Sequence, residues 1–137
     1  MIMRPRQFFA LLFTTLFLTG CGPAPDQPVG TLSGQDLMAR LDAGDAPLIL
    51  DVRTPAEYAA GHIPGAVNIP HDALGARLAE LGGDRDREIV VHCQSGRRAA
   101  TAEELLMDAG YTGVAHLDGD IVGWQSAGLP VVTATAP

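Results

Sequence analysis

Short apolar segments that alternate with helical segments constrain the fold of this chain more than any other feature. Residues 48–52, 89–92 and 114–117 are mainly apolar runs, and a fourth short strand is expected at residues 66–69. Such runs are typical of a parallel sheet with both faces covered. Helical sequence between successive strands implies right-handed crossovers. We therefore expect an α/β fold with a parallel sheet and helices on both faces.

Capping signals mark the helices between those strands. A first helix is expected to begin after Ser33 or Gly34 as its cap and to end at Gly44. Thr54 followed by Pro55 is typical of the start of a second helix. Three further helices are expected at residues 72–81, at residues 99–109 and around residues 121–125.

A cysteine lies at one of the predicted strand-to-helix turns. Cys93 follows the strand at residues 89–92. The loop after it consists of Gln94, Ser95, Gly96, Arg97 and Arg98. A helix N-terminus and nearby guanidinium groups stabilise a thiolate, and they lower the pKa of such cysteines to roughly 3.5–7.5. The sequence therefore predicts a nucleophilic thiolate at the carboxyl end of a strand, where ligands bind on parallel sheets.

The N-terminal segment has the features of a bacterial export signal. Two arginines precede an apolar stretch at residues 8–18, and Gly/Pro-rich sequence follows closely. Residues 18–21 (LTGC) resemble a lipobox, in which cleavage before the cysteine leaves an N-terminal Cys that carries lipid. We expect residues 1–20 to be a lipoprotein signal peptide and Cys21 to be lipidated. A plain secretory signal and an uncleaved membrane anchor are the alternatives.

Lipid on Cys21 would make the membrane a partner of this protein. It would hold the domain in the bacterial cell envelope, facing the periplasm, and Gly22 in place of an aspartate favours the outer membrane. With Cys21 joined to lipid, Cys93 is the one thiol left in a compartment where cysteine pairs become disulfides. Cys93 is therefore expected to be reactive, and an inert buried cysteine is the alternative.

The remaining sequence divides into a tether, one domain and a short tail. Residues 21–30 contain three prolines and are expected to form a semi-extended tether of roughly 25–30 Å. Residues 31–133 suffice for one compact domain, and residues 134–137 form a C-terminal tail. No metal-binding motif is present, so we expect neither a metal nor another cofactor.

Net charge gives weight to the two arginines after Cys93. The chain has no lysine. Without residues 1–20 it contains seven arginines and sixteen acidic residues, which give a formal net charge of −9. We therefore expect no nucleic-acid partner. Arg97 and Arg98 predict a local anion site on an otherwise acidic protein. Alternatively, they only begin a solvated helix.

Several segments together resemble the single-domain rhodanese (thiosulfate sulfurtransferase) family, in the family's order and over nearly all of the mature domain. They are residues 51–53 (DVR), residues 57–70 (EYAAGHIPGAVNIP), residues 93–98 (CQSGRR), Trp124 and residues 128–131 (GLPV). The resemblance implies a rhodanese-like α/β fold with a central parallel five-stranded sheet. It also implies that Cys93 is catalytic and carries sulfur as a persulfide.

The resemblance further implies a substrate and roles for the neighbouring residues. Sulfur would pass from a small anion such as thiosulfate to cyanide, a thiol or a protein acceptor. The N–H groups from Gln94 to Arg98 are expected to bind the anion, with Arg98 favoured over Arg97 as the binding arginine. Asp51 and Arg53 are expected to give structural support to the neighbouring loops.

Two alternatives and one departure from the family pattern remain. A noncatalytic rhodanese-like module, which carries sulfur or binds a partner, is the alternative function. Tyrosine-phosphatase loops need five residues between Cys and Arg, whereas Arg98 comes one residue early and Ala99 takes that position. Asp120 replaces the usual Gly, and we expect this acid to lie near the pocket mouth and to disfavour thiosulfate.

Overall fold

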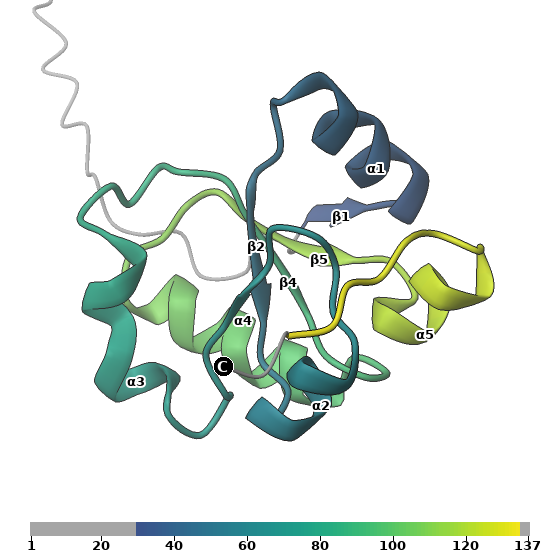
Figure 1. Cartoon of the computed structure of the whole chain (residues 1–137). Coiled ribbons are helices and arrows are strands. Elements are labelled where there is room, and N and C mark those ends of the chain that lie inside the picture. The colour runs from purple at the N-terminus through teal and green to yellow at the C-terminus, as the bar shows by residue number, and fades with distance from the viewer. Residues whose placement is uncertain (1–29, 135–137) are drawn as a thin grey trace, which may run out of the picture.

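Five parallel strands form a sheet at the centre of the molecule (Figure 1). The computed structural model describes residues 30–134. The strands are β1 (Gly30–Leu32), β2 (Leu48–Asp51), β3 (Val67–Asn68), β4 (Ile89–His92) and β5 (Val114–Leu117). Their order across the sheet is β1-β5-β4-β2-β3, and every neighbouring pair is parallel. The predicted five-stranded parallel sheet is confirmed.

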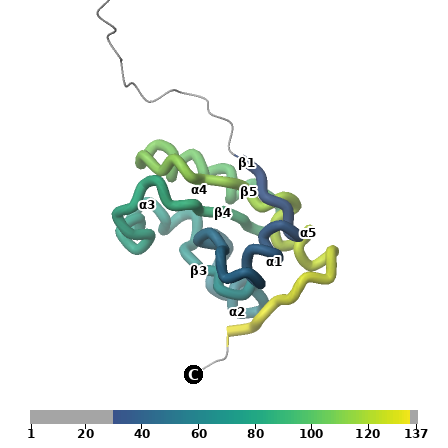
Figure 2. Tube along the Cα trace, turned by 90° about the horizontal axis from the view of Figure 1, so that it is seen from above, coloured from purple at the N-terminus to yellow at the C-terminus, as the bar shows by residue number. Residues whose placement is uncertain are grey.

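Helices cover both faces of this sheet, as predicted. They are α1 (Gly34–Ala43), α2 (Pro55–Ala60), α3 (Leu74–Arg77), the 3₁₀ helix η1 (Leu78–Leu81), α4 (Arg97–Asp108) and α5 (Asp120–Ser126). One apolar cluster joins one face of the sheet to α3, η1 and α4, and a second joins the other face to α1, α2 and α5. Figure 2, which looks from above, shows α3 and α4 on the opposite side of the sheet from α1 and α5.

The predicted caps begin the first two helices. The side chain of Ser33 accepts a hydrogen bond from the backbone N–H of Asp36, and Gly44 ends α1 in a left-handed conformation with φ of 72°. Thr54 and Glu57 form a reciprocal capping box at the start of α2. These bonds satisfy backbone N–H groups that have no partner inside the helix.

Other element boundaries differ from the sequence-based expectation. The helix expected at residues 72–81 begins only at Leu74, and its last turn tightens into η1. Strand β1 was not singled out, because three residues on an edge strand are too short to show a pattern; it starts at Gly30, which was assigned to the tether. The expected signal peptide and the lipidation site at Cys21 lie outside the described residues.

Strand β4 lies between β5 and β2 and carries the site at its carboxyl end. Its alternating side chains divide between the two cores: Val91 and Cys93 pack towards α4, and Val90 packs in the cluster that contains Trp124. In register, Asp51 of β2 lies opposite His92 of β4. Because all strands are parallel, the residues that follow β2, β4 and β5 meet at the carboxyl end of the sheet.

Within residues 30–134, no helix combines the length and apolar character needed to cross a bilayer.

Candidate active site

Cys93 lies between the end of β4 and the start of α4, as predicted. Its Sγ atom accepts a hydrogen bond from the backbone N–H of Gly96 at 3.1 Å. Gly96 is the N-cap of α4 and has a left-handed backbone with φ of 99°, a conformation that favours glycine. The sulfur is therefore placed beside the N-terminus of a helix of twelve residues, where partial positive charge stabilises an anion.

The loop covers the thiol while exposing its own polar side chains. Cys93 is only 1% exposed and packs in the same apolar cluster as Ala99 and Ala102 of α4. Gln94 and Ser95, by contrast, are exposed. The thiol is therefore almost completely covered, and the exposed side chains of Gln94 and Ser95 form the solvent side of the loop.

Arg98 is held next to the sulfur by a carboxylate from α2. Its guanidinium donates two hydrogen bonds to Glu57, at 2.8 and 2.9 Å. The bond to Glu57 is the main reason that the pKa of Arg98 lies above its usual value, and the nearby Cys93 side chain raises it further. In turn, the hydrogen bond from Arg98 holds the pKa of Glu57 well below its usual value, against the opposing effect of burial and with additional bonds from Thr54.

The two arginines of the loop therefore have different environments. Arg97 is exposed, whereas Arg98 is half-buried, lies within electrostatic reach of Sγ and is tied to Glu57. The choice of Arg98 over Arg97 as the binding arginine stays a prediction. Glu57 is a residue that the sequence analysis did not assign to the site.

A pocket of about 250 Å³ opens beside the Cys93 loop. It is lined by Arg53, Glu57, Ala60, Gly61, Gln94 and Gln125. These residues come from the segment after β2, from the loop after β4 and from α5. The pocket thus lies at the carboxyl edge of the sheet, as expected for a ligand site on a parallel sheet.

Asp51 and Arg53 form a buried ion pair at the edge of this pocket. Arg53 Nη2 lies 2.6 Å from Asp51 Oδ2 and donates a second bond to the carbonyl of Gly61 at 2.8 Å. Asp51 is 0% exposed and Arg53 is 4% exposed. The pair joins the end of β2 to the segment after α2.

Two histidines near the site serve the scaffold. His62 Nδ1 lies 2.9 Å from the carbonyl of Tyr58, and the two rings stack with centroids 3.7 Å apart. His92 is fully buried, and burial lowers its pKa despite the opposing charge of Asp51. With His92 on the other side of β4 and His62 stacked on Tyr58, Cys93 is the candidate nucleophile at this end of the sheet.

Most of the described chain matches a known protein family. The family model for the rhodanese-like domain matches residues 33–127, which run from α1 to α5 and include four of the five strands. The chain belongs to the rhodanese family. A sulfurtransferase from Allochromatium vinosum is 38% identical to this rhodanese over 104 residues, which cover 76% of the chain and 95% of that relative.

Other relatives place the same domain in different contexts. An HTH-type transcriptional regulator from Mycobacterium tuberculosis is 45% identical over 106 residues, but the matched region covers only 45% of the regulator. The crystal structure of the Alr3790 protein from Anabaena superposes with a TM-score of 0.68 at 33% identity, covering 74% of this chain and 82% of that one. The rhodanese fold is therefore shared by proteins with different whole-chain roles.

The expectation for Asp120 in this rhodanese domain is wrong. Asp120 is 3% exposed, and its Oδ1 accepts a hydrogen bond from the backbone N–H of Cys93 at 2.8 Å. It lies behind the loop and does not line the pocket, so its expected position at the pocket mouth is what the structure corrects. Its partner His116, and Glu103 on the other side of His116, were also not assigned to the site, because their proximity depends on the fold.

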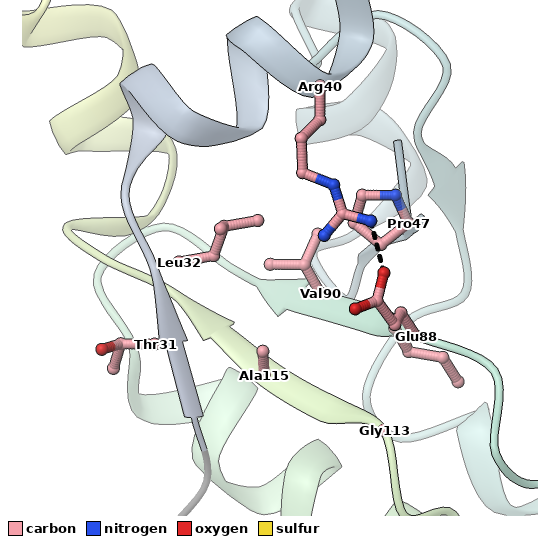
Figure 3. A pocket seen from close by; sticks show the side chains of 9 residues that line it. Thr31, Leu32, Arg40, Pro47, Glu88, Val90, Gly113 and Ala115 are labelled. Atoms are coloured by element: carbon pink, nitrogen blue, oxygen red, sulfur yellow. Dashed lines mark hydrogen bonds and ion pairs between the residues drawn. The ribbon is translucent and has the colours of Figure 1, made fainter. Parts of the chain in front are cut away.

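A second pocket of the rhodanese domain, of about 140 Å³, lies at the opposite edge of the sheet (Figure 3). Pro47 and Gly113 line it, and both precede strands rather than follow them. Its charged side chains, Arg40 and Glu88, form an ion pair with one another across the opening. No cysteine lines this pocket, so the carboxyl end of the sheet, with Cys93, is the candidate active site.

Proposed function

We propose that this rhodanese is a sulfurtransferase that carries sulfane sulfur as a persulfide on Cys93. The observation that carries the proposal is the position of Sγ, which accepts the Gly96 N–H at the start of α4 with the Arg98 guanidinium nearby. These groups stabilise negative charge on sulfur in the thiolate and in the persulfide. The similarity to sulfurtransferases supports the same reaction class.

In the first half-reaction, the Cys93 thiolate attacks the outer sulfur of thiosulfate or a similar donor. A new S–S bond forms to Sγ, the S–S bond of the donor breaks, and sulfite leaves with the bonding electron pair. The thiol proton has already passed to solvent. The persulfide anion that remains carries its charge on the outer sulfur, near the N–H groups of the loop.

In the second half-reaction, an acceptor attacks the outer sulfur of the persulfide. Cyanide takes that sulfur as thiocyanate, while a thiolate acceptor takes it as a new persulfide, and the Cys93 thiolate is regenerated in both cases. Because one nucleophile serves both displacements, the kinetics are expected to be ping-pong. With lipid on Cys21, the reaction would take place on the periplasmic side of the cell envelope.

Intact-protein mass spectrometry tests the proposal. Incubation with thiosulfate should add one sulfur atom to the protein, and cyanide should remove it and release thiocyanate. Protein alkylated at Cys93 beforehand is the control and should gain no sulfur. A protein that stays unloaded with thiosulfate and with other sulfane donors would instead be the noncatalytic module.

Replacing Arg98 should weaken donor binding more than replacing its neighbour. We expect Arg98→Ala to raise the KM for thiosulfate about tenfold, because a charge-assisted contact beside Sγ is lost. Arg97→Ala removes the same charge from an exposed position, and salt screening should limit its effect to about twofold. Steady-state kinetics at constant ionic strength measure both, and equal effects of the two variants would contradict the assignment.

A further inference from the structure

Three titratable side chains form a hydrogen-bonded chain behind the Cys93 loop. Glu103 Oε1 lies 2.6 Å from His116 Nδ1, and His116 Nε2 lies 3.2 Å from Asp120 Oδ2. The other oxygen of Asp120 accepts the backbone N–H of Cys93 at 2.8 Å. The side chains are 8%, 22% and 4% exposed for Glu103, His116 and Asp120 respectively. The chain thus connects α4, β5 and the start of α5 to the nucleophile.

Asp120 occupies an unfavourable backbone conformation in order to make this contact. Its φ is +54°, the one positive value among the non-glycine residues of the described chain, 30–134. Such a conformation disfavours residues with a side chain and is kept only where the surroundings fix it. Here the carboxylate gains the Cys93 N–H and the His116 imidazole.

The hydrogen bonds imply a protonated imidazole. Both ring nitrogens of His116 face carboxylate oxygens. While both carboxylates are ionised they only accept hydrogen bonds, so the two bonds then require a proton on each nitrogen. Burial lowers the pKa of His116, but the bonds and charges of Glu103 and Asp120 outweigh burial and leave the pKa raised. Together, Glu103, His116 and Asp120 carry one net negative charge when His116 is protonated and two when it is not.

Gly96 brings this charge close to the sulfur. The backbone N–H of Gly96 donates to Sγ at 3.1 Å. A Cβ atom on Gly96 would lie 3.1 Å from Asp120 Oδ2 and 3.7 Å from His116 Cε1. A single backbone unit therefore separates the carboxylate of Asp120 from Sγ. Added negative charge at this distance disfavours a thiolate.

We propose that Asp120, His116 and Glu103 are positioning residues for Cys93. Asp120 fixes the backbone of the nucleophile, and the His116 cation, held by Glu103, offsets the negative charge of Asp120 near the sulfur. The thiolate, and by the same reasoning the persulfide of the proposed function, is favoured while His116 is protonated. The meaning of this device for sulfur transfer depends on the proposed function, whereas its effect on the thiolate does not.

Other groups that face the chain do not account for the same pH dependence. His92 of β4 also senses Asp120, but burial lowers its pKa, so it titrates below the range in which His116 does. The residues opposite His116 in the neighbouring strands, Thr31 and Val91, carry no charge. Arg98 stays charged throughout this range, because its pKa is raised.

The pH dependence of Cys93 alkylation by iodoacetamide tests the proposal on the full chain, without any sulfur donor. At about pH 6, His116→Gln should slow alkylation by about three- to tenfold, because the variant lacks the cation that favours the thiolate. At a pH above the midpoint of the His116 titration, where the imidazole is neutral in the wild type too, the two proteins should react equally fast. His71→Gln makes the same substitution at a histidine outside the Glu103–His116–Asp120 group and should match the wild type at both pH values.

A double-mutant cycle separates the charge effect from a packing effect. Asp120→Asn keeps an oxygen acceptor for the Cys93 N–H but removes the negative charge that the His116 cation offsets. In the Asp120→Asn background, His116→Gln still removes one positive charge, so a pure charge effect predicts a similar slowing at pH 6, and a clearly different factor would show a packing effect. In Glu103→Gln, His116 should lose its proton, and with it the charge that favours the thiolate, at a lower pH. The variant removes the carboxylate that raises the pKa of His116 most.

An NMR titration of the wild type keeps the proposal testable if a variant fails to fold. The His116 ring and the Gly96 amide should shift with one common midpoint above about pH 6.5. Equal slowing of His116→Gln at every pH, or a Gly96 amide that ignores the His116 titration, would overturn the proposal. If the pH dependence holds but no donor loads sulfur, the proposed function fails and the positioning role stands. If sulfur loads but this pH dependence is missing, the positioning role fails and the proposed function stands.

Discussion

Cys93→Ser is expected to lower kcat/KM for sulfur transfer by at least about a thousandfold, to the level of the uncatalysed reaction. A serine hydroxyl is not ionised near neutral pH and cannot form a persulfide, so neither half-reaction can proceed. The fold should survive, because Oγ can accept the Gly96 N–H that Sγ accepts at 3.1 Å. Thiocyanate release measures the activity, and thermal unfolding followed by circular dichroism measures the stability.

Cys93→Ala separates the chemical role of the sulfur from its structural role. It should be as inactive as Cys93→Ser but less stable, by about 1 kcal/mol, because the partly buried Gly96 N–H loses its acceptor. Significant turnover in either variant would show that another group carries the sulfur. Loss of folded structure in Cys93→Ser would show that the thiol is a core residue first, as its 1% exposure permits.

The sheet could be predicted from the sequence wherever its strands are buried on both faces. Strands Ile89–His92 and Val114–Leu117 were predicted residue for residue, because continuous apolar runs between helical segments have few other interpretations. The edge strand Gly30–Leu32 gives no such signal, since two of its three residues are exposed. Its pairing with β5 depends on a contact between distant parts of the chain.

The same distinction applies to the candidate site. Cys93 and the loop to Arg98 are contiguous, so their chemistry could be inferred from adjacent residues. Glu57 reaches Arg98 across 41 positions and Asp120 reaches Cys93 across 27 positions, and no local pattern encodes these contacts. The sequence showed that Asp120 was unusual, but not that a left-handed backbone turns its carboxylate behind the loop rather than towards the mouth.

Asp51→Ala is expected to lower the free energy of unfolding by about 3–5 kcal/mol, the cost of leaving a buried charge without its partner. Arg53 donates to both oxygens of Asp51, through Nε at 3.0 and 3.1 Å and through Nη2 at 2.6 Å, and its backbone N–H donates to Oδ1 at 3.0 Å. Without Asp51, the guanidinium keeps the carbonyl of Gly61 as its hydrogen-bond partner at 2.8 Å. Urea unfolding of both proteins measures the difference.

The exposed pair Arg77–Glu80 provides the matched control, because it joins the same types of charge in water. Its side chains are 39% and 50% exposed, and Glu80→Ala should change the unfolding free energy by less than about 1 kcal/mol. Removing both buried charges in Asp51→Ala/Arg53→Met should recover part of the lost stability, since no unpaired charge stays buried. If the double variant were less stable than Asp51→Ala, the guanidinium would stabilise this edge without its carboxylate, through Gly61 and the pocket wall. A small effect of Asp51→Ala alone would mean that water reaches Arg53, and that the ion pair is not what joins β2 to the segment after α2.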